Sequence, residues 1–585
     1  MLNYIDRMWE RMSADEQDML KRIYAPTVVA VPLADARRDI CVLPDGEIRS
    51  YEVTETQPGE EPPRQRYLSS TDGGLSWKVR YARGSMGPCT YIERAGIYLS
   101  AVGSPQGKEG LWVCRSEVGP DDPDPEMLHL SDDYYFDLYL PKQSAFGKRV
   151  WFTAQRRGTG DAITELYAVY WYSDDFGVTW QKNELQVAEK FETVFPHKGN
   201  RWHIKSGVEP YVEELSAEKM VMMLRTPLDC FYTSYSQDGG TTWSQPEPST
   251  FYGTNTTFFL LRLRDGRLLS FWNNAKPLSM PNHRLSRTAV PESVVIGRGE
   301  SAFTNRDAAH AAISQDGGKT YIGYRELLLN PIRGNADFRY VGDPATSHDK
   351  SVHQFQAFEL PFGKILVCVG QNIAARRLLI FDVNWLYETD REENFLDGLG
   401  GITTHTYVKS VSGCTVRELG NGHCAWNRAQ NAYLMPDPDG GRSEALYICK
   451  RHDPRLLNDI GGAVWNFPAS RQGEITVELK LLEKQARFSL ADRWYNTCDP
   501  YVTYQVPFWF EVDAEDVGGE YATLTFSYDT EQGVGALAVN GDHFFKVKMR
   551  GACPTGLSYL ILQCDTDGDS QGFYVRRLSK KAGNV

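Results

Sequence analysis

The chain has no long apolar segment, although it contains 585 residues. No run approaches the roughly 20 apolar residues that a helix needs to cross a bilayer, so we expect no membrane partner. The first residues, MLNYIDRMWERMSADEQDML, are charged throughout and lack the apolar stretch of a secretory signal. These absences predict a cytoplasmic protein and leave open only the earlier removal of a signal.

Clustered cysteines and an excess of basic charge are also missing. The 11 cysteines are scattered without C-x-x-C spacing, and an odd number leaves at least one unpaired, which favours reduced thiols over a disulfide framework. The net charge of -13 opposes broad binding to nucleic acid, whose phosphates need basic patches. We therefore expect no metal, no cofactor and no nucleic-acid partner; the oligomeric state stays open.

Helical periodicity is nearly absent beyond the first residues. In SADEQDMLKRIY, Ser13 and Glu16 have the spacing of a capping box, which predicts a helix that ends near Ala25 and docks on the body. From Thr27 onward, short apolar runs alternate with turns, and segments such as ICVLPDGEIRSY contain the D-G turns of hairpins. The sequence therefore predicts an all-β protein after a helical leader at 1–25.

One turn pattern, S-x-D-x-G-x-S/T-aromatic, occurs four times, as in SSTDGGLSW at Ser69–Trp77. Its Asp can accept backbone N–H groups, its Gly permits the positive φ that closes the turn, and its aromatic residue can wedge between neighbouring sheets. The pattern therefore predicts a structural turn, and we do not expect its acids to be catalytic. These acids are Asp72, Asp175, Asp238 and Asp316.

This repeat resembles the Asp-box of the sialidase (neuraminidase) superfamily. The resemblance, together with repeats every 50 to 70 residues or so, implies a six-bladed sialidase-type β-propeller at 26–395. The remaining residues, 396–585, form alternating strands, with a two-residue hairpin at Asn540-Gly541. They predict a C-terminal β-sandwich of jelly-roll or concanavalin-like form, which either binds carbohydrate or serves as a packing partner.

Two further stretches match sialidase segments around the Asp-boxes. VEPYVEEL followed by a strand ending in MLRT places Glu209 sixteen residues before Arg225, and NRDAAHAAISQDGG places Arg306 eight residues before an Asp-box serine. DARRDICVLPDGEI offers Arg37 or Arg38, of which Arg38 is our candidate. The resemblance implies that three such guanidiniums converge on the carboxylate of an acidic sugar, because each planar fork can donate paired hydrogen bonds.

The segment SVHQFQAFELPFG departs from the family, which has a tyrosine nucleophile there. Gln354, beside His353, occupies that position, so Tyr340 from a nearby loop is our candidate nucleophile and His353 a candidate acid or base. The proton donor is left open among three glutamates. These are Glu52, Glu55 and Glu60.

A sugar-binding role is also predicted for Asn273, in FWNNAKP, at a strand end where polar groups can meet sugar hydroxyls. The sequence thus predicts an exo-glycosidase of sialidase type that hydrolyses a terminal acidic sugar. Two alternatives remain: a glycan-binding propeller without activity, and a propeller glycosidase or lyase with different catalytic residues. The predicted catalytic residues are Glu209, His353 and Tyr340, and the predicted substrate-binding residues are Arg38, Arg225, Arg306, Gln354 and Asn273.

Overall fold

Strands dominate the structure, a computed structural model, and this confirms the predicted all-β class. None of the helices in the described ranges is long and apolar enough to cross a membrane. The described residues are 3–34, 40–52, 65–82, 86–105, 108–160, 165–187, 208–226, 228–253, 256–276, 306–333, 351–407, 428–440, 444–453, 459–482, 485–499, 502–564 and 572–583.

The N-terminus contains two helices, α1 (Asn3–Arg11) and α2 (Ala14–Arg22), where the sequence predicts one. The predicted capping box is present, with the Ser13 amide donating to Glu16 Oε2 at 2.7 Å. The helix ends at Arg22, before the predicted Ala25, because Ile23 is extended and Lys364 Nζ donates to its carbonyl at 2.5 Å. Docking on the body is confirmed, since apolar side chains of both helices enter one core cluster with strands of the ring.

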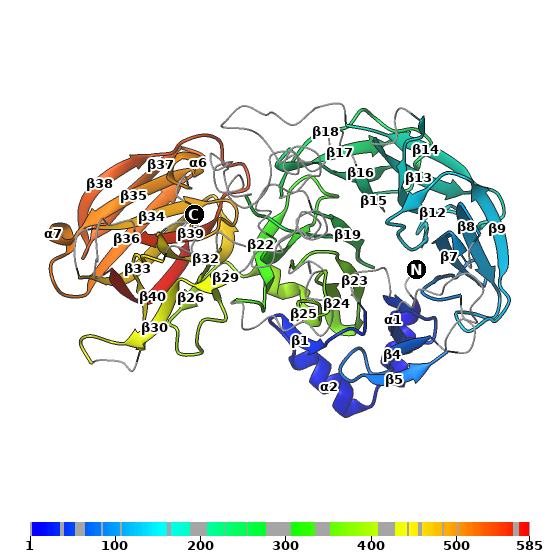
Figure 1. The fold of residues 1–585 in the computed structure, drawn as a ribbon, viewed down its shortest axis with the longest axis horizontal. Helices are drawn as coiled ribbons and strands as arrows, with labels where there is room; N and C mark the ends of the chain where they lie inside the picture. The colour runs from blue at the N-terminus through cyan, green and yellow to red at the C-terminus, as the bar shows by residue number, and fades with distance from the viewer. Residues whose placement is uncertain are drawn as a thin grey trace.

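The described residues between 27 and 382 form six antiparallel sheets, which Figure 1 shows arranged in a ring. Sheet one contains β2 (Ile40–Val42), β3 (Ile48–Tyr51), β4 (Arg66–Ser70) and β5 (Lys78–Tyr81). Sheet two contains β6 (Thr90–Ile92), β7 (Ile97–Gly103), β8 (Leu111–Ser116) and β9 (Glu126–Ser131). Sheet three contains β10 (Tyr135–Phe136), β11 (Lys142–Gln143), β12 (Val150–Arg157), β13 (Leu166–Ser173) and β14 (Gln181–Leu185).

The other three sheets complete the ring. Sheet four contains β15 (Val208–Glu214), β16 (Met220–Arg225), β17 (Cys230–Ser236) and β18 (Glu247–Tyr252). Sheet five contains β19 (Phe259–Arg262), β20 (Leu268–Trp272), β21 (Ala308–Ser314) and β22 (Ile322–Leu329). Sheet six contains β23 (Gln356–Glu359), β24 (Lys364–Val369), β25 (Arg377–Asp382) and, from the start of the chain, β1 (Thr27–Ala30), so the two ends of the ring are hydrogen-bonded together.

The first strands of the sheets surround the centre of the ring. Residues of β2, β6, β11, β15, β19 and β23 line one cavity of about 350 Å³, and Asn3 and Tyr4 of α1 border it. On β15, the cavity is lined by Tyr211, Glu213 and Glu214, and the last two lie at the end of the strand farthest from Glu209. The opposite end of these strands is therefore where the predicted site residues lie.

The four Asp-box turns have the predicted structural role. In each, the aspartate accepts a hydrogen bond from the first serine and from at least one backbone amide of the turn, as at Asp238, where Thr241 N and Thr242 N lie 3.0 and 2.8 Å from Oδ1. The hydroxyl of Thr242 and these amides lower the pKa of Asp238 to about 2. The carboxylates of the Asp-boxes are therefore occupied by hydrogen bonds within their own turns.

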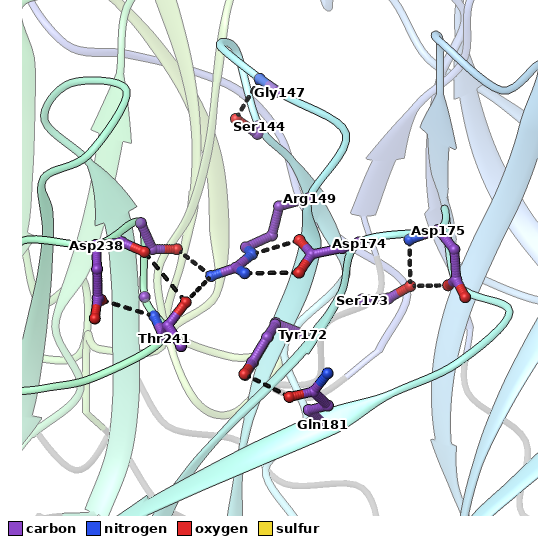
Figure 2. Close-up of polar contacts among 12 residues, drawn as sticks. Ser144, Gly147, Arg149, Tyr172, Ser173, Asp174, Asp175, Gln181, Asp238 and Thr241 are labelled. Carbon is purple, nitrogen blue, oxygen red and sulfur yellow. Dashed lines mark hydrogen bonds and ion pairs between the residues drawn. The ribbon is translucent and has the colours of Figure 1, made fainter.

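The Asp-box turns also join neighbouring sheets. Trp243, which ends the third turn, packs edge-on against Tyr170 of sheet three, with ring centroids 5.3 Å apart. Figure 2 shows Arg149 of sheet three forming a two-pronged ion pair with Asp174, at 2.7 Å to each oxygen, while it donates to Thr241 Oγ1 at 3.1 Å. The predicted wedge between sheets is therefore present and is reinforced by an arginine.

Replacing Asp238 with Ala should lower the free energy of unfolding by about 1–2 kcal/mol, because turn amides lose their acceptor. Asp72→Ala should cost more, since Asp72 is buried and one of its donors, the Ser70 hydroxyl at 2.8 Å, is buried as well. The gap between wild type and Asp238→Ala should shrink as pH falls from about 4 towards 2, because a depressed pKa stabilises only above it. Urea unfolding at several pH values checks this, and a pH-independent gap would contradict the role of the carboxylate.

The C-terminal module, residues 391–583, contains two large antiparallel sheets. The larger has β30 (Ala432–Pro436), β31 (Glu444–Ile448), β40 (Phe573–Ala582), β33 (Gln472–Leu481), β36 (Ala522–Asp529), β37 (Val534–Val539) and β38 (Asp542–Lys548), with β26 (Arg391–Glu393) also paired to β40. The smaller has β27 (Ile402–Thr403), β32 (Gly461–Ser470), β39 (Leu557–Cys564), β34 (Gln485–Ala491) and β35 (Phe508–Asp513). A separate two-stranded ribbon joins β28 (His405–Tyr407) to β29 (Arg428–Gln430).

Short helical segments are η4 (Pro361–Gly363), η5 (Val383–Tyr387), α6 (Val502–Gln505) and α7 (Ala514–Val517).

Both large sheets contribute side chains to one core cluster. Burial alternates along β33, as expected for a strand with one face on a core. The predicted hairpin is confirmed, since Val539 pairs with Asp542 and both turn residues, Asn540 and Gly541, have positive φ. The predicted boundary at 396 stays a prediction; β26, which precedes it, pairs with β40 of the module.

The C-terminal module packs on sheet five, as Figure 1 shows. Asn466 of β32 donates to the carbonyl of Tyr324 at 3.1 Å and accepts from the amide of Glu326 at 3.0 Å, both on β22. These two hydrogen bonds therefore fix the module to sheet five. Arg306 lies just before β21 of the same sheet.

Candidate functional site

Glu209 and Arg225 form a buried ion pair in sheet four. Glu209 Oε2 accepts from Arg225 Nη1, and the two side chains are only 3% and 2% exposed. The pairing of β15 with β16 shifts between Val208 and Tyr211, so Glu209 lies in a bulge, with φ of 43°. Such backbone is costly for a residue other than glycine and clusters at functional sites.

Arg306 lies within electrostatic reach of this pair. Burial lowers the pKa of Arg225 to about 10; Glu209 opposes that effect and Arg306 adds to it. Arg306 itself is fully buried and precedes β21 in sheet five. The site therefore brings two buried guanidiniums together beside the carboxylate of Glu209, and guanidiniums are well suited to bind a carboxylate.

His353 is the neighbour of Arg306. Its Nε2 lies 3.3 Å from Arg306 Nη1, and its Nδ1 lies 2.6 Å from Ser351 Oγ. Because a guanidinium only donates, Nε2 has to be the accepting nitrogen, and we assign the proton of a neutral ring to Nδ1. His353 therefore orients Arg306, and its predicted catalytic role remains a prediction.

Gln354, at the position of the family's tyrosine, also has a left-handed backbone, with φ of 66°. The backbone amide of Gln354 donates to Thr257 Oγ1 at 3.2 Å. The left-handed residue connects the His353 segment to β23, one of the strands that line the central cavity. Sheets four, five and six thus each bring a predicted residue to the same end of the ring.

The predicted sugar contact of Asn273 stays a prediction, and the structure gives its side chain partners within the protein. Its amide nitrogen donates to the carbonyl of Ala308 at 2.7 Å and to that of Val352 at 2.9 Å. Both amide hydrogens are therefore used inside the protein, and Asn273 ties the segments of Arg306 and His353 together. Strand-end position alone suggested a ligand contact, but the two nearby backbone segments were invisible in the sequence.

Asn273→Asp should lower the free energy of unfolding by about 2–4 kcal/mol, since it places a carboxylate against two buried carbonyls. Asn394→Asp is the matched control, because Asn394 is exposed and its side-chain oxygen already accepts, from the amide of Leu396. Thermal unfolding of both variants measures the difference. Unchanged stability combined with lost sugar affinity would restore the predicted ligand role.

Several predicted residues have other positions. Arg38 and its alternative Arg37, Tyr340, Glu55 and Glu60 lie outside the described residues. Glu52 is described, and both of its oxygens accept from Arg66, at 2.8 and 2.7 Å. This ion pair gives Glu52 a partner within sheet one.

Two residues near this cluster could not be identified as site residues from the sequence. Arg376 is fully buried and donates to the carbonyl of Gly370, whose amide in turn donates to the carbonyl of His353 at 2.7 Å. Asp137 also acts on Arg225, raising its pKa, and accepts from Gln155. Neither is part of an Asp-box or a matched segment, so only the tertiary structure identifies them.

Three solved structures match the chain at low similarity. A Trypanosoma rangeli sialidase in complex with 2,3-difluorosialic acid is 11% identical, with 96% of this chain and 92% of that chain covered and a TM-score of 0.32. A protein of unknown function from Dyadobacter fermentans is 16% identical, covers 61% and 97% and has a TM-score of 0.39. An exo-β-1,3-galactanase from Phanerochaete chrysosporium is 7% identical, covers 95% and 100% and has a TM-score of 0.30. Similarity of this degree does not extend to shared activity, so function has to be argued from the site.

None of the curated proteins compared with the chain matches it. Residues 143–340 match the family model described as a BNR repeat-like domain. This range contains the second, third and fourth Asp-box turns, together with Glu209, Arg225 and Arg306. The match confirms the Asp-box resemblance that the sequence predicts, and the chain carries a BNR repeat-like fold over that range.

Proposed function

We propose that the chain is a sialidase-type glycoside hydrolase that removes a terminal acidic sugar from glycans. The six sheets of residues 27–382 would be the blades of a propeller, and the two large sheets of the C-terminal module a β-sandwich. The domains would then be a leader at 1–25, a propeller to about 390 and a sandwich from Arg391, where β26 begins. The predicted cytoplasmic location is part of the same proposal.

The buried cluster of Arg225, Arg306 and Glu209 is the observation that carries this proposal. A carboxylate bound against this cluster would meet two guanidiniums whose forks match its geometry. Burial strengthens such hydrogen bonds because little water competes for them. A neutral sugar would gain none of this attraction, so the site favours an acidic one.

Hydrolysis also needs a group that takes a proton on one face of the sugar and an acid that protonates the leaving oxygen. Glu209 fits the first role, because it is an acid placed by a strained bulge beside the arginines. The nucleophile would be Tyr340 or a water molecule, given that Gln354 stands at the family's tyrosine position. For the proton donor, Asp137 joins Glu55 and Glu60 as a candidate.

A glycan-binding protein without activity is the second candidate. The observation in its favour is that Glu209 is already paired with Arg225. In addition, Gln354, in the segment before β23, stands where the family has its nucleophile. A binding site needs the arginines but no free base. The two functions therefore share the carboxylate contact and differ only in turnover.

A panel of aryl glycosides of sialic acid, related keto-acids and uronic acids tests the proposal. Release of the aryl alcohol from at least one acidic glycoside, and from none of the neutral ones, is the expected result. Saturable binding without release would favour the glycan-binding alternative, and release of an unsaturated sugar would point to a lyase. Absence of both binding and release across the panel would refute the acidic-sugar site.

A further inference from the structure

Asp307, directly after Arg306, is fully buried where sheet five meets the C-terminal module. Its Oδ1 accepts from Asn330 Nδ2 at 2.8 Å, within the same sheet region. The module supplies three more donors to this carboxylate. They are Arg428 Nη2 at 2.6 Å, His405 Nε2 at 3.1 Å and the hydroxyl of Tyr407, all from the β28–β29 ribbon.

This carboxylate is charged despite its burial. Burial opposes ionisation, but Arg428 and His405 hold the pKa of Asp307 well below its usual range. Burial lowers the pKa of His405, so at neutral pH its ring is neutral and donates one hydrogen. Arg428, which is itself 0% exposed, then provides the counter-charge, and removing either partner of such a pair is costly.

The backbone around Asp307 is held on both sides. The carbonyl of Arg306 accepts from the Val352 amide at 2.9 Å, and the carbonyl of Asp307 accepts from the Asn330 amide at 2.7 Å. The Arg306 side chain contacts His353 while the Asp307 side chain contacts the module. Fixing one of these two adjacent side chains therefore constrains where the other can point.

We infer that the C-terminal module is a working part of the sugar site, because Tyr407 and Arg428 act through Asp307 as positioning residues for Arg306. This inference rests on the proposed function, in which Arg306 binds the carboxylate of the sugar. A module that served only as a separate carbohydrate-binding unit would need no such contact. Losing the clamp should let the Arg306 guanidinium move and weaken its two-pronged contact, without changing the residues that touch the sugar.

Tyr407→Phe is the main test, since it removes one hydroxyl donor to Asp307 and leaves the shape intact. Tyr559→Phe is the matched control, because the Tyr559 hydroxyl also bridges the module to sheet five, where it bonds to Glu326 at 2.6 Å and to His310 rather than to Asp307. Tyr407→Phe should weaken binding of sialic acid or glucuronic acid by about three- to tenfold, the effect of one hydrogen bond. The carboxamide analogues of these sugars, and the Tyr559→Phe variant, should show no such change.

Hydrogen–deuterium exchange gives a second readout that needs no ligand. In Tyr407→Phe, and more strongly in Arg428→Lys, the amides of Val352 and Asn330 should exchange about three- to tenfold faster, while Tyr559→Phe leaves them unchanged. Adding Arg306→Lys to Tyr407→Phe should give less than the product of the two separate losses of affinity, since both act through the same guanidinium.

Exchange and affinity that stay at wild-type values in Tyr407→Phe and Arg428→Lys would overturn the positioning role. Equal weakening of acidic sugars and their carboxamides would also overturn it, because this would indicate general damage to the fold. Wild-type protein that binds no acidic sugar would refute the proposed function instead. The exchange rates would then still decide whether the module holds the Arg306 segment.

Discussion

Glu209→Gln should reduce turnover of a cleavable acidic glycoside by about 10²–10⁴-fold, the usual contribution of a positioned acid or base. Affinity for the sugar should stay the same or increase. The reason is that Glu209 is the buried counter-ion of Arg225, and an amide in its place removes a negative charge that repels the carboxylate of the ligand. Steady-state kinetics and equilibrium binding on one protein preparation separate the two effects.

Glu214→Gln is the matched control for this variant, because Glu214 is another buried glutamate of β15 and lies at the end that lines the central cavity. It should keep wild-type turnover. Near-normal turnover in Glu209→Gln would remove Glu209 from the chemistry. Loss of affinity together with turnover would mean that Glu209 contacts the sugar mainly as a binding group.

Arg225→Lys should weaken binding of an acidic sugar by about 10- to 100-fold, because a lysine keeps the charge but cannot reproduce the planar fork. Affinity for the carboxamide analogue should change little. The fold should survive, since lysine can still pair with Glu209. Calorimetric titration of both sugars, with the melting temperature recorded for each protein, measures this effect.

Arg149→Lys provides the control for Arg225→Lys. Arg149 also forms a two-pronged pair with a carboxylate, that of Asp174, but at the Asp-box turns of sheets three and four (Figure 2). This variant should lose some stability and no sugar affinity. Equal affinity in wild type and Arg225→Lys would show that the carboxylate is bound elsewhere.

The Asp-box turns could be predicted because each is a local structure. Spacing within eight residues determines which amides reach the aspartate, and the four turns have the predicted bonds. Helix α1 was not predicted because few of its side chains are buried, chiefly Ile5 and Met8. Many of the residues in the core cluster that it joins belong to β2, β3 and β24. The end of α2 before Ala25 was likewise not predictable, because Lys364, which donates to the Ile23 carbonyl, is distant in the sequence.

Contacts in the site could be predicted only where both residues lie on one hairpin, because the pairing of its strands determines the distance between them. Glu209 and Arg225 meet because β15 and β16 pair antiparallel, and the spacing of the two residues already indicated this. Contacts between sheets could not be read in this way. The bonds of Asn273 to two backbone carbonyls, the place of Arg376 and the clamp on Asp307 all depend on how sheets and module pack.

The crystal structure of the Glu209→Gln variant soaked with sialic acid tests the central claim most directly. The account predicts that the carboxylate of the sugar lies between the guanidiniums of Arg225 and Arg306, with both within hydrogen-bond distance of its oxygens. A sugar bound with its carboxylate away from both arginines would contradict it. So would a site left without sugar at saturating concentrations of sialic acid.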